Sequence, residues 1–158
     1  HVAGHRLASP APRQLQSAGA RQHPVEQDQV RLVGHCTDVP AAMALSDLAV
    51  VASIEPEAFG RAAVEAQAAR VPVIVSDLGA VPETVLAPPD AAEKDRTGWR
   101  VSPGDSDALA SAIKTALALS AEDRLALTGR GLTHASRNFT VETMCTKTLD
   151  VYAKLLDR

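Results

Sequence analysis

The sequence has few aromatic residues and few cysteines. Aromatics make up 3% of the 158 residues, so a core drawn from the 46% hydrophobic residues has to consist of Ala, Val and Leu. Small side chains of this kind suit close packing of helices on a sheet. The two cysteines, Cys36 and Cys145, are far apart and lack metal-ligand spacing. This favours a reducing, cytoplasmic setting, with a single disulfide left open as the alternative.

Strong charge and long apolar runs are also missing. The formal net charge is -3, which argues against a nucleic-acid binder, because such proteins usually present a basic stripe. No apolar segment is long enough to span a membrane, and the first residues do not have the pattern of a signal peptide. The P-loop, the standard dinucleotide fingerprint and the hydrolase nucleophile elbow are all absent. A cytoplasmic enzyme or binding domain remains.

The composition divides the chain into two parts. Residues 1–29 carry three prolines and few large apolar residues, which predicts a poorly ordered leader with a short strand at Val2–Ala3 and a modest helix near Pro12 to Ala20. From Val30 the apolar pattern becomes regular. Residues 30–158 are therefore predicted to form one domain that ends in closing C-terminal helices.

Predicted strands and helices alternate over the middle of this domain. Short apolar runs predict strands at 30–35, 48–53, 73–77 and 99–101, and amphipathic or capped segments predict helices at 38–47, 60–70, 106–119, 120–138 and 141–156. Such alternation predicts an α/β fold with a doubly wound parallel sheet. Ligands of such sheets bind beyond the carboxyl ends of the strands.

The stretch from Glu57 to Arg70 has the composition of a ligand site at a helix start. It reads EAFGRAAVEAQAAR and follows a predicted strand. The first backbone N–H groups of a helix have no intrahelical partner, and a glycine such as Gly60 lets a phosphate approach them. The helix start therefore offers N–H donors and a partial positive charge to a diphosphate.

Two glutamates flank this proposed diphosphate site. Helical side chains lean towards the N-terminus, so the carboxylate of Glu65 can reach a group beside the phosphates, such as the paired hydroxyls of a ribose. Glu57 precedes the helix and can accept hydroxyls on the other side of the diphosphate. The plainer alternative is that both acids are ordinary helix-start and surface residues.

The same residues resemble a known family. Glu57 and Glu65, inside EAFGRAAVEAQAARVPVIVSDLGAVPETV, are similar to the E-x7-E region of family 4 glycosyltransferases, which are retaining enzymes of the GT-B fold with nucleotide-sugar donors. The flanking segments VRLVGHCTDVPAAMALSDLAVVAS, TGWRVSPGDSDALASAI and NFTVETMCTKTLDVYAKLL are also similar to the family pattern. The resemblance covers about residues 30 to 156 and implies the C-terminal half of a GT-B enzyme.

The resemblance implies a role for each part of the motif. Glu65 would bind the nucleotide ribose and Glu57 the donor sugar, and backbone amides would face the diphosphate and the base. The implied donor-binding residues are Glu57, Phe59, Gly60, Arg61, Ala62, Glu65, Gly34 and Cys36. No catalytic residue, metal site or cofactor is implied in this chain. His134 is expected at the surface, and Arg61 is expected to be solvated.

The implied function is transfer of a hexosyl group, with retention, from a nucleotide-diphosphate sugar. A GT-B enzyme has two domains, and the N-terminal acceptor domain is missing from this resemblance, so the chain is expected to be inactive alone. The implied location is cytoplasmic, with the inner face of the membrane as a place of peripheral association for a full-length protein. Two alternatives stay open: a non-catalytic nucleotide-sugar-binding module and an assembly module.

Overall fold

The computed structural model describes residues 34–156. The chain separates into a unit of residues 1–34 and a unit of residues 35–158, and the helices and strands of the described residues all belong to the second. The predicted leader over 1–29, with its strand and helix, lies outside the described residues. The same holds for Val30 to Val33 of the predicted strand over 30–35, and Gly34 and His35 have no regular secondary structure.

A parallel three-stranded sheet forms the centre of the described unit. Its strands β1 (Ala49–Val51), β2 (Val73–Ser76) and β3 (Trp99–Val101) lie side by side in the order β1-β2-β3. Ile74 is paired with Val50 on one side and with Trp99 on the other. All four residues of β2 are buried, as expected for a central strand that is covered on both faces.

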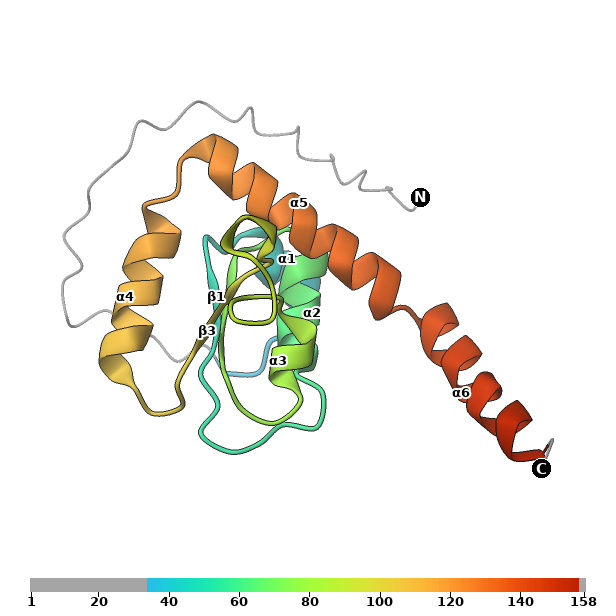
Figure 1. Cartoon of the computed structure of the whole chain (residues 1–158). Helices are drawn as coiled ribbons and strands as arrows, with labels where there is room; N and C mark the ends of the chain where they lie inside the picture. The colour runs from blue at the N-terminus through green and yellow to red at the C-terminus, as the bar shows by residue number, and fades with distance from the viewer. Residues whose placement is uncertain (1–33, 157–158) are drawn as a thin grey trace, which may run out of the picture. The chain divides into compact units, whose positions relative to one another are not determined.

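Six α-helices and one 3-10 turn accompany the sheet within the described residues (Figure 1). The helices are α1 (Val39–Ala44), α2 (Arg61–Ala68), α3 (Val81–Thr84), α4 (Ser106–Leu117), α5 (Ala121–Asn138) and α6 (Val141–Leu156), and the 3-10 turn η1 spans Glu93–Asp95. The bounds of α6 agree with the prediction. The predicted starts of α1 and α5 are confirmed by their caps, because Asp38 accepts from the N–H of Ala41 at 3.0 Å and Ser120 accepts from the N–H of Asp123 at 3.0 Å.

The core has two layers because successive residues of β2 point to opposite faces of the sheet. Val73 and Val75 pack with the alanines of α2 and the valines around α3, whereas Ile74 packs with Trp99 and with residues of α4 and α5. Figure 1 shows α2 and α4 on opposite sides of the sheet. The predicted α/β class with a parallel sheet between helices is confirmed.

Helix α6 differs from the others because none of its residues is buried. The helix predicted at 141–156 carries an apolar stripe, but the members of this stripe are 59 to 67% exposed. They are Val141, Met144, Leu149, Tyr152 and Leu155. Within residues 34–156 this face therefore has no packing partner. No helix among the described residues combines the length and apolarity that a membrane crossing requires.

Candidate functional site

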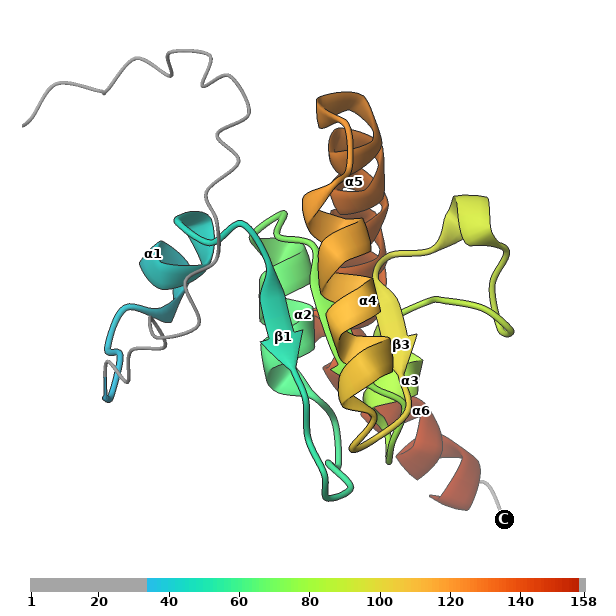
Figure 2. The same ribbon diagram turned by 90° about the vertical axis from the view of Figure 1, so that its left-hand side faces the viewer.

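The loop between β1 and α2 leaves the sheet at the carboxyl ends of the strands and enters the predicted site (Figure 2). Helix α2 begins at Arg61, and Gly60 is its N-cap with φ 76°. A Cβ at Gly60 would lie 3.0 Å from Cγ2 of Val81 at the start of α3. A left-handed backbone and a close neighbour both favour glycine here. The helix start predicted near Phe59 or Gly60 is thus shifted by only one or two residues.

The start of α2 leaves backbone donors unpaired. Within the described part of the chain, no hydrogen bond is donated by the N–H groups of Phe59, Gly60, Arg61 or Ala62. The N-cap has no side chain that could accept from them, and the first internal bond is from the N–H of Ala63 to the carbonyl of Gly60 at 3.0 Å. These four amides are free to face an anionic group, and the positive end of the helix dipole adds to their attraction.

Glu57 is held on both its backbone and its side chain. Its carbonyl accepts a hydrogen bond from the N–H of Ala80 at 3.0 Å. Its carboxylate oxygen Oε1 accepts a hydrogen bond from the hydroxyl of Ser53. These two bonds fix the position of the carboxylate on the loop that precedes the four amides. Because the side chain is only half-buried, the carboxylate can still accept further hydrogen bonds.

Glu65 lies one turn into α2 on the side of the helix that faces α1. Its Oε1 accepts from Nε of Arg61 at 2.9 Å, and its side chain remains 37% exposed. It borders a cavity of about 310 Å³ whose walls include Val39, Pro40 and Met43 of α1. That α1 lines this cavity could not be predicted from the sequence, because the contact depends on how α1 and α2 pack against each other.

The loop before α1 contains the two remaining predicted residues. Gly34 is exposed and has φ 71°, and it belongs to the first unit of the chain. Cys36 is exposed with a free thiol, two residues before the Asp38 cap of α1. Helix α1 lines the cavity beside Glu65. Cys36 therefore lies close in sequence to the N-terminal end of that helix.

The side chain of Phe59 contacts residues that the sequence did not connect with the site. Its ring meets Phe139 edge-on, with centroids 5.6 Å apart, and Phe139 meets His134 in the same way at 5.3 Å. The prediction that His134 lies at the surface is wrong: the residue is half-buried, and burial lowers the pKa of its imidazole. The end of α5 therefore supports the loop before α2. Arg61, by contrast, is 82% exposed as predicted.

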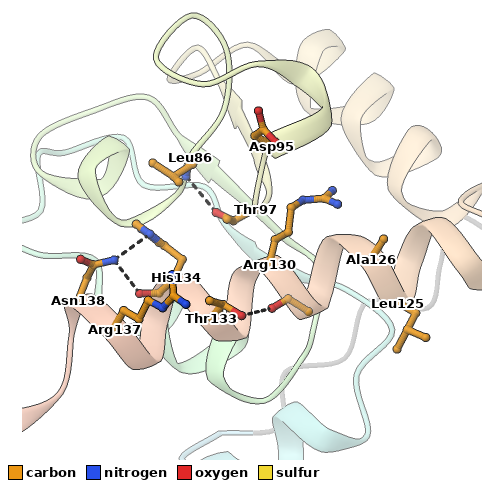
Figure 3. Close-up of a pocket in the computed structure, with 11 residues that line it drawn as sticks. Leu86, Asp95, Thr97, Leu125, Ala126, Arg130, Thr133, His134, Arg137 and Asn138 are labelled. Carbon is orange, nitrogen blue, oxygen red and sulfur yellow. Dashed lines mark hydrogen bonds between the residues drawn. The ribbon is translucent and has the colours of Figure 1, made fainter.

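A second cavity, of about 560 Å³, lies between α5 and the segment 86–97 (Figure 3). Arg130, His134 and Arg137 line it from α5, and Asp95 and Thr97 line it from the segment 86–97. None of the predicted donor-binding residues lines it. Nε of Arg130 already donates to the carbonyl of Arg96 at 2.9 Å. Among residues 34–156 there is no group of three or more His, Cys, Asp or Glu side chains that could hold a metal ion.

Comparisons with known proteins agree with this geometry. Residues 1–118 match the family described as Glycosyl transferases group 1. The chain is 32% identical, over 82% of its length, to a lipopolysaccharide core biosynthesis mannosyltransferase, LpsB, of Rhizobium meliloti. It is 33% identical, over 84% of its length, to a glycogen synthase of Mycobacterium tuberculosis. These alignments span 35% and 30% of the two relatives, so the chain corresponds to about a third of their length.

Solved structures give the same result. A glycosyltransferase from Rickettsia africae superposes with a TM-score of 0.73 at 30% identity, over 82% of this chain and 33% of that one. Anabaena Alr3699/HepE in complex with UDP-glucose superposes with a TM-score of 0.69 at 27% identity, over 81% of this chain and 33% of that one. The parallel sheet with its flanking helices thus matches the architecture of GT-B glycosyltransferases. The chain belongs to the group 1 glycosyltransferases.

Proposed function

We propose that this chain supplies the donor-binding half of a retaining, family 4 type hexosyltransferase that uses a nucleotide-diphosphate sugar. One arrangement carries this proposal. Glu57 and Glu65 lie on either side of four unpaired backbone amides at the start of α2, on the carboxyl edge of a parallel sheet. The carboxylates accept hydrogen bonds from sugar hydroxyls, and the amides between them donate hydrogen bonds to the diphosphate.

The assignment within the site follows from this arrangement. The carboxylate of Glu65 opens onto the cavity formed with α1, which suits the ribose and its base. The carboxylate of Glu57 suits the hydroxyls of the transferred sugar. As the glycosidic bond breaks, negative charge collects on the leaving diphosphate, and the helix-start amides stabilise it there. Oriented amides and a helix dipole act without a metal ion.

Transfer itself would require the other half of the enzyme. The chain spans about a third of the length of its relatives, and the resemblance assigns the acceptor to the other half. We therefore expect this chain to bind a donor without turning it over. Rapid transfer of sugar by the 158-residue chain alone would contradict this expectation.

Two relatives suggest the probes. Alr3699/HepE was solved with UDP and with UDP-glucose, and LpsB is a mannosyltransferase. A panel of UDP, UDP-glucose, GDP and GDP-mannose therefore tests two bases, each with and without a hexose. A ligand that binds only the folded chain stabilises it by about 2.7 kcal/mol at about one hundred times its Kd, so thermal unfolding reports binding.

The decisive variant is Glu65→Gln, which keeps the shape of the side chain and removes its charge. We expect at least one nucleotide to raise the melting temperature of the original chain and the Glu65→Gln variant to lose most of that rise. Glu122→Gln is the matched control, because Glu122 is an exposed acid in the first turn of α5. An equal rise in melting temperature in all three proteins would mean that the nucleotide binds away from Glu65.

An assembly function is the second candidate, and the exposed apolar face of α6 is the observation that favours it. The same experiment separates the two. If none of the four ligands stabilises the chain, the donor site is excluded and assembly becomes the better interpretation. A non-catalytic binding module would give the same thermal shifts as a donor domain, and it would still transfer no sugar in a protein that carries both halves.

A further inference from the structure

The turn between β2 and α3 packs directly on the backbone of Glu57. Gly79 in this turn has φ 64°, and a Cβ added to it would lie 2.7 Å from the carbonyl oxygen of Glu57 and 2.9 Å from its nitrogen. Real Cβ atoms essentially never come this close to backbone atoms. The next residue, Ala80, donates its N–H to the same Glu57 carbonyl at 3.0 Å.

The turn is itself fixed to the sheet, so it can act as a support. The N–H of Asp77 donates to the carbonyl of Val101 at 2.8 Å, which extends the pairing of β2 with β3. The guanidinium of Arg100, whose side chain is 5% exposed, lies beside the carboxylate of Asp77 with Nε and Oδ1 3.8 Å apart. Any side chain at position 79 would therefore displace the Glu57 loop more readily than the turn.

We propose that Gly79 is a positioning residue for the backbone of Glu57, and that Ser53 holds the carboxylate of Glu57 in place. The close approach at Gly79 sets where the backbone of Glu57 lies, and the Ser53 hydroxyl bound to Oε1 sets where the carboxylate points. Together they determine how well the hydroxyls of the donor hexose are held. This inference rests on the proposed function, because it assigns the donor sugar to Glu57.

The inference predicts a selective loss. A Cβ at position 79 moves Glu57, which contacts the hexose, whereas Glu65 lies farther along α2 and contacts the nucleotide. Hydrogen bonds to a charged group are strong enough that losing them lowers affinity about tenfold or more. We expect Gly79→Ala to weaken UDP-glucose, or GDP-mannose if that is the ligand that binds, about tenfold or more. The affinity for UDP or GDP should change less than about twofold.

The test is an NMR titration of the 158-residue chain and its variants with both pairs of ligands. Gly129→Ala is the matched control, because Gly129 lies in α5 and an added Cβ there meets nothing within 4 Å. Gly79→Ala should also have little further effect in a Glu57→Gln background, since both changes disable the same contact. A purely structural role would weaken nucleotide and nucleotide-sugar alike and would add to the effect of Glu57→Gln.

Ser53→Ala keeps the inference testable if Gly79→Ala does not fold. It leaves the backbone unchanged and removes only the hydroxyl that holds the Glu57 carboxylate, so we expect the same selective loss in weaker form. If the original chain binds none of the four ligands, the proposed function fails and this inference fails with it. If the original chain binds the sugar nucleotide more tightly than the nucleotide, and all the folded variants keep that difference, only the positioning role is overturned.

Discussion

Arg61 and Glu65 form an ion pair one turn apart on α2, with Nε of Arg61 2.9 Å from Oε1 of Glu65. Arg61 is 82% exposed and Glu65 is 37% exposed, so the pair contributes at most about 0.5 kcal/mol to folding. The ion pair matters for binding because a ribose would compete with Arg61 for the carboxylate of Glu65. One oxygen of the carboxylate that the proposed ribose needs is already paired with Arg61, and a ribose that takes this oxygen would displace the guanidinium.

The first prediction concerns Arg61→Gln. When a ribose takes over the carboxylate of Glu65, the released guanidinium is free to approach the diphosphate beside the helix-start amides. We therefore expect Arg61→Gln to weaken UDP or GDP severalfold and to leave uridine or guanosine unchanged or slightly tighter. Titrations at low and at moderate salt check this, because an interaction with phosphate weakens as ionic strength rises.

A different result would assign Arg61 another role. Equal weakening of nucleoside and nucleotide would mean that Arg61 supports the shape of the site and does not interact with phosphate. Arg70→Gln serves as control, since Arg70 is also exposed but follows the last turn of α2. It should change neither affinity, and its substitution should alter stability by less than about 0.5 kcal/mol.

The second prediction compares two glycines that share a left-handed backbone. Gly60 has φ 76° and Gly104 has φ 74°, but a Cβ at Gly60 would lie 3.0 Å from Cγ2 of Val81, whereas a Cβ at Gly104 would meet nothing within 4 Å. An alanine in this region costs about 1–2 kcal/mol. We expect Gly104→Ala to lower the free energy of unfolding by about that amount and Gly60→Ala to lower it further. Urea unfolding measures both, and equal losses would contradict the role given to Val81.

Local sequence signals predicted most of the described fold. The strand predicted at 73–77 begins at Val73, directly after Pro72, which cannot donate to a sheet. The helices predicted at 38–47 and 120–138 begin at Asp38 and Ser120, which are the caps of α1 and α5. The nearly continuous apolar run of β2 predicted a strand buried on both faces. Each of these signals depends only on neighbouring residues, and so it can be recognised without knowledge of the tertiary structure.

The parts that could not be predicted depend on contacts between distant segments. The edge contact between Phe59 and Phe139 joins residues that meet only because α5 packs on α2. The approach of Gly79 to Glu57 depends in the same way on the crossover between β1 and β2. For α6, periodicity identified the apolar face but carries no information on what covers it. Sequence therefore located the two glutamates, and the structure supplied what holds them.

The third prediction concerns Arg100, which ties the segment after α3 to β3. Its guanidinium donates to the carbonyls of Ala87 and Pro88 at 3.1 and 3.3 Å and to the carboxylate of Asp90 at 2.6 Å. The Arg100 side chain is 5% exposed and Ala87 is buried, whereas Pro88 and Asp90 are exposed. Arg100→Gln should therefore leave the carbonyl of Ala87 unpaired and lower the free energy of unfolding by about 1–3 kcal/mol.

Arg100→Lys separates the charge of this residue from its geometry. A lysine keeps the positive charge but lacks the planar fork that reaches several acceptors at once, so we expect a smaller loss than for Arg100→Gln. Urea unfolding of both variants gives the comparison. A change of less than about 0.5 kcal/mol for Arg100→Gln would be the value expected for an ordinary surface site, and it would show that the bonds of Arg100 are replaced by water at no cost.

The fourth prediction is a pH dependence that originates at His134. Burial lowers the pKa of its imidazole, and the nearby backbone carbonyl of Glu83 opposes this without overcoming it. Its Nε2 is buried and makes no hydrogen bond within the described residues. Because the folded pKa is the lower one, the unfolded chain binds more protons between the two pKa values. His134 therefore contributes its full stability above the ordinary histidine pKa, near 6.5, and that contribution is lost as the pH falls through the folded pKa.

We expect the free energy of unfolding to fall on acidification from pH 7 towards pH 5, and His134→Gln to reduce the slope of that fall. His35→Gln is the matched control, because His35 is exposed in the described unit, and it should leave the slope unchanged. Urea unfolding at half-unit pH steps measures the difference. If His134→Gln had the same slope as the original chain, the acid sensitivity would come from carboxylates. The aromatic contact of His134 with Phe139 would then have only a packing role.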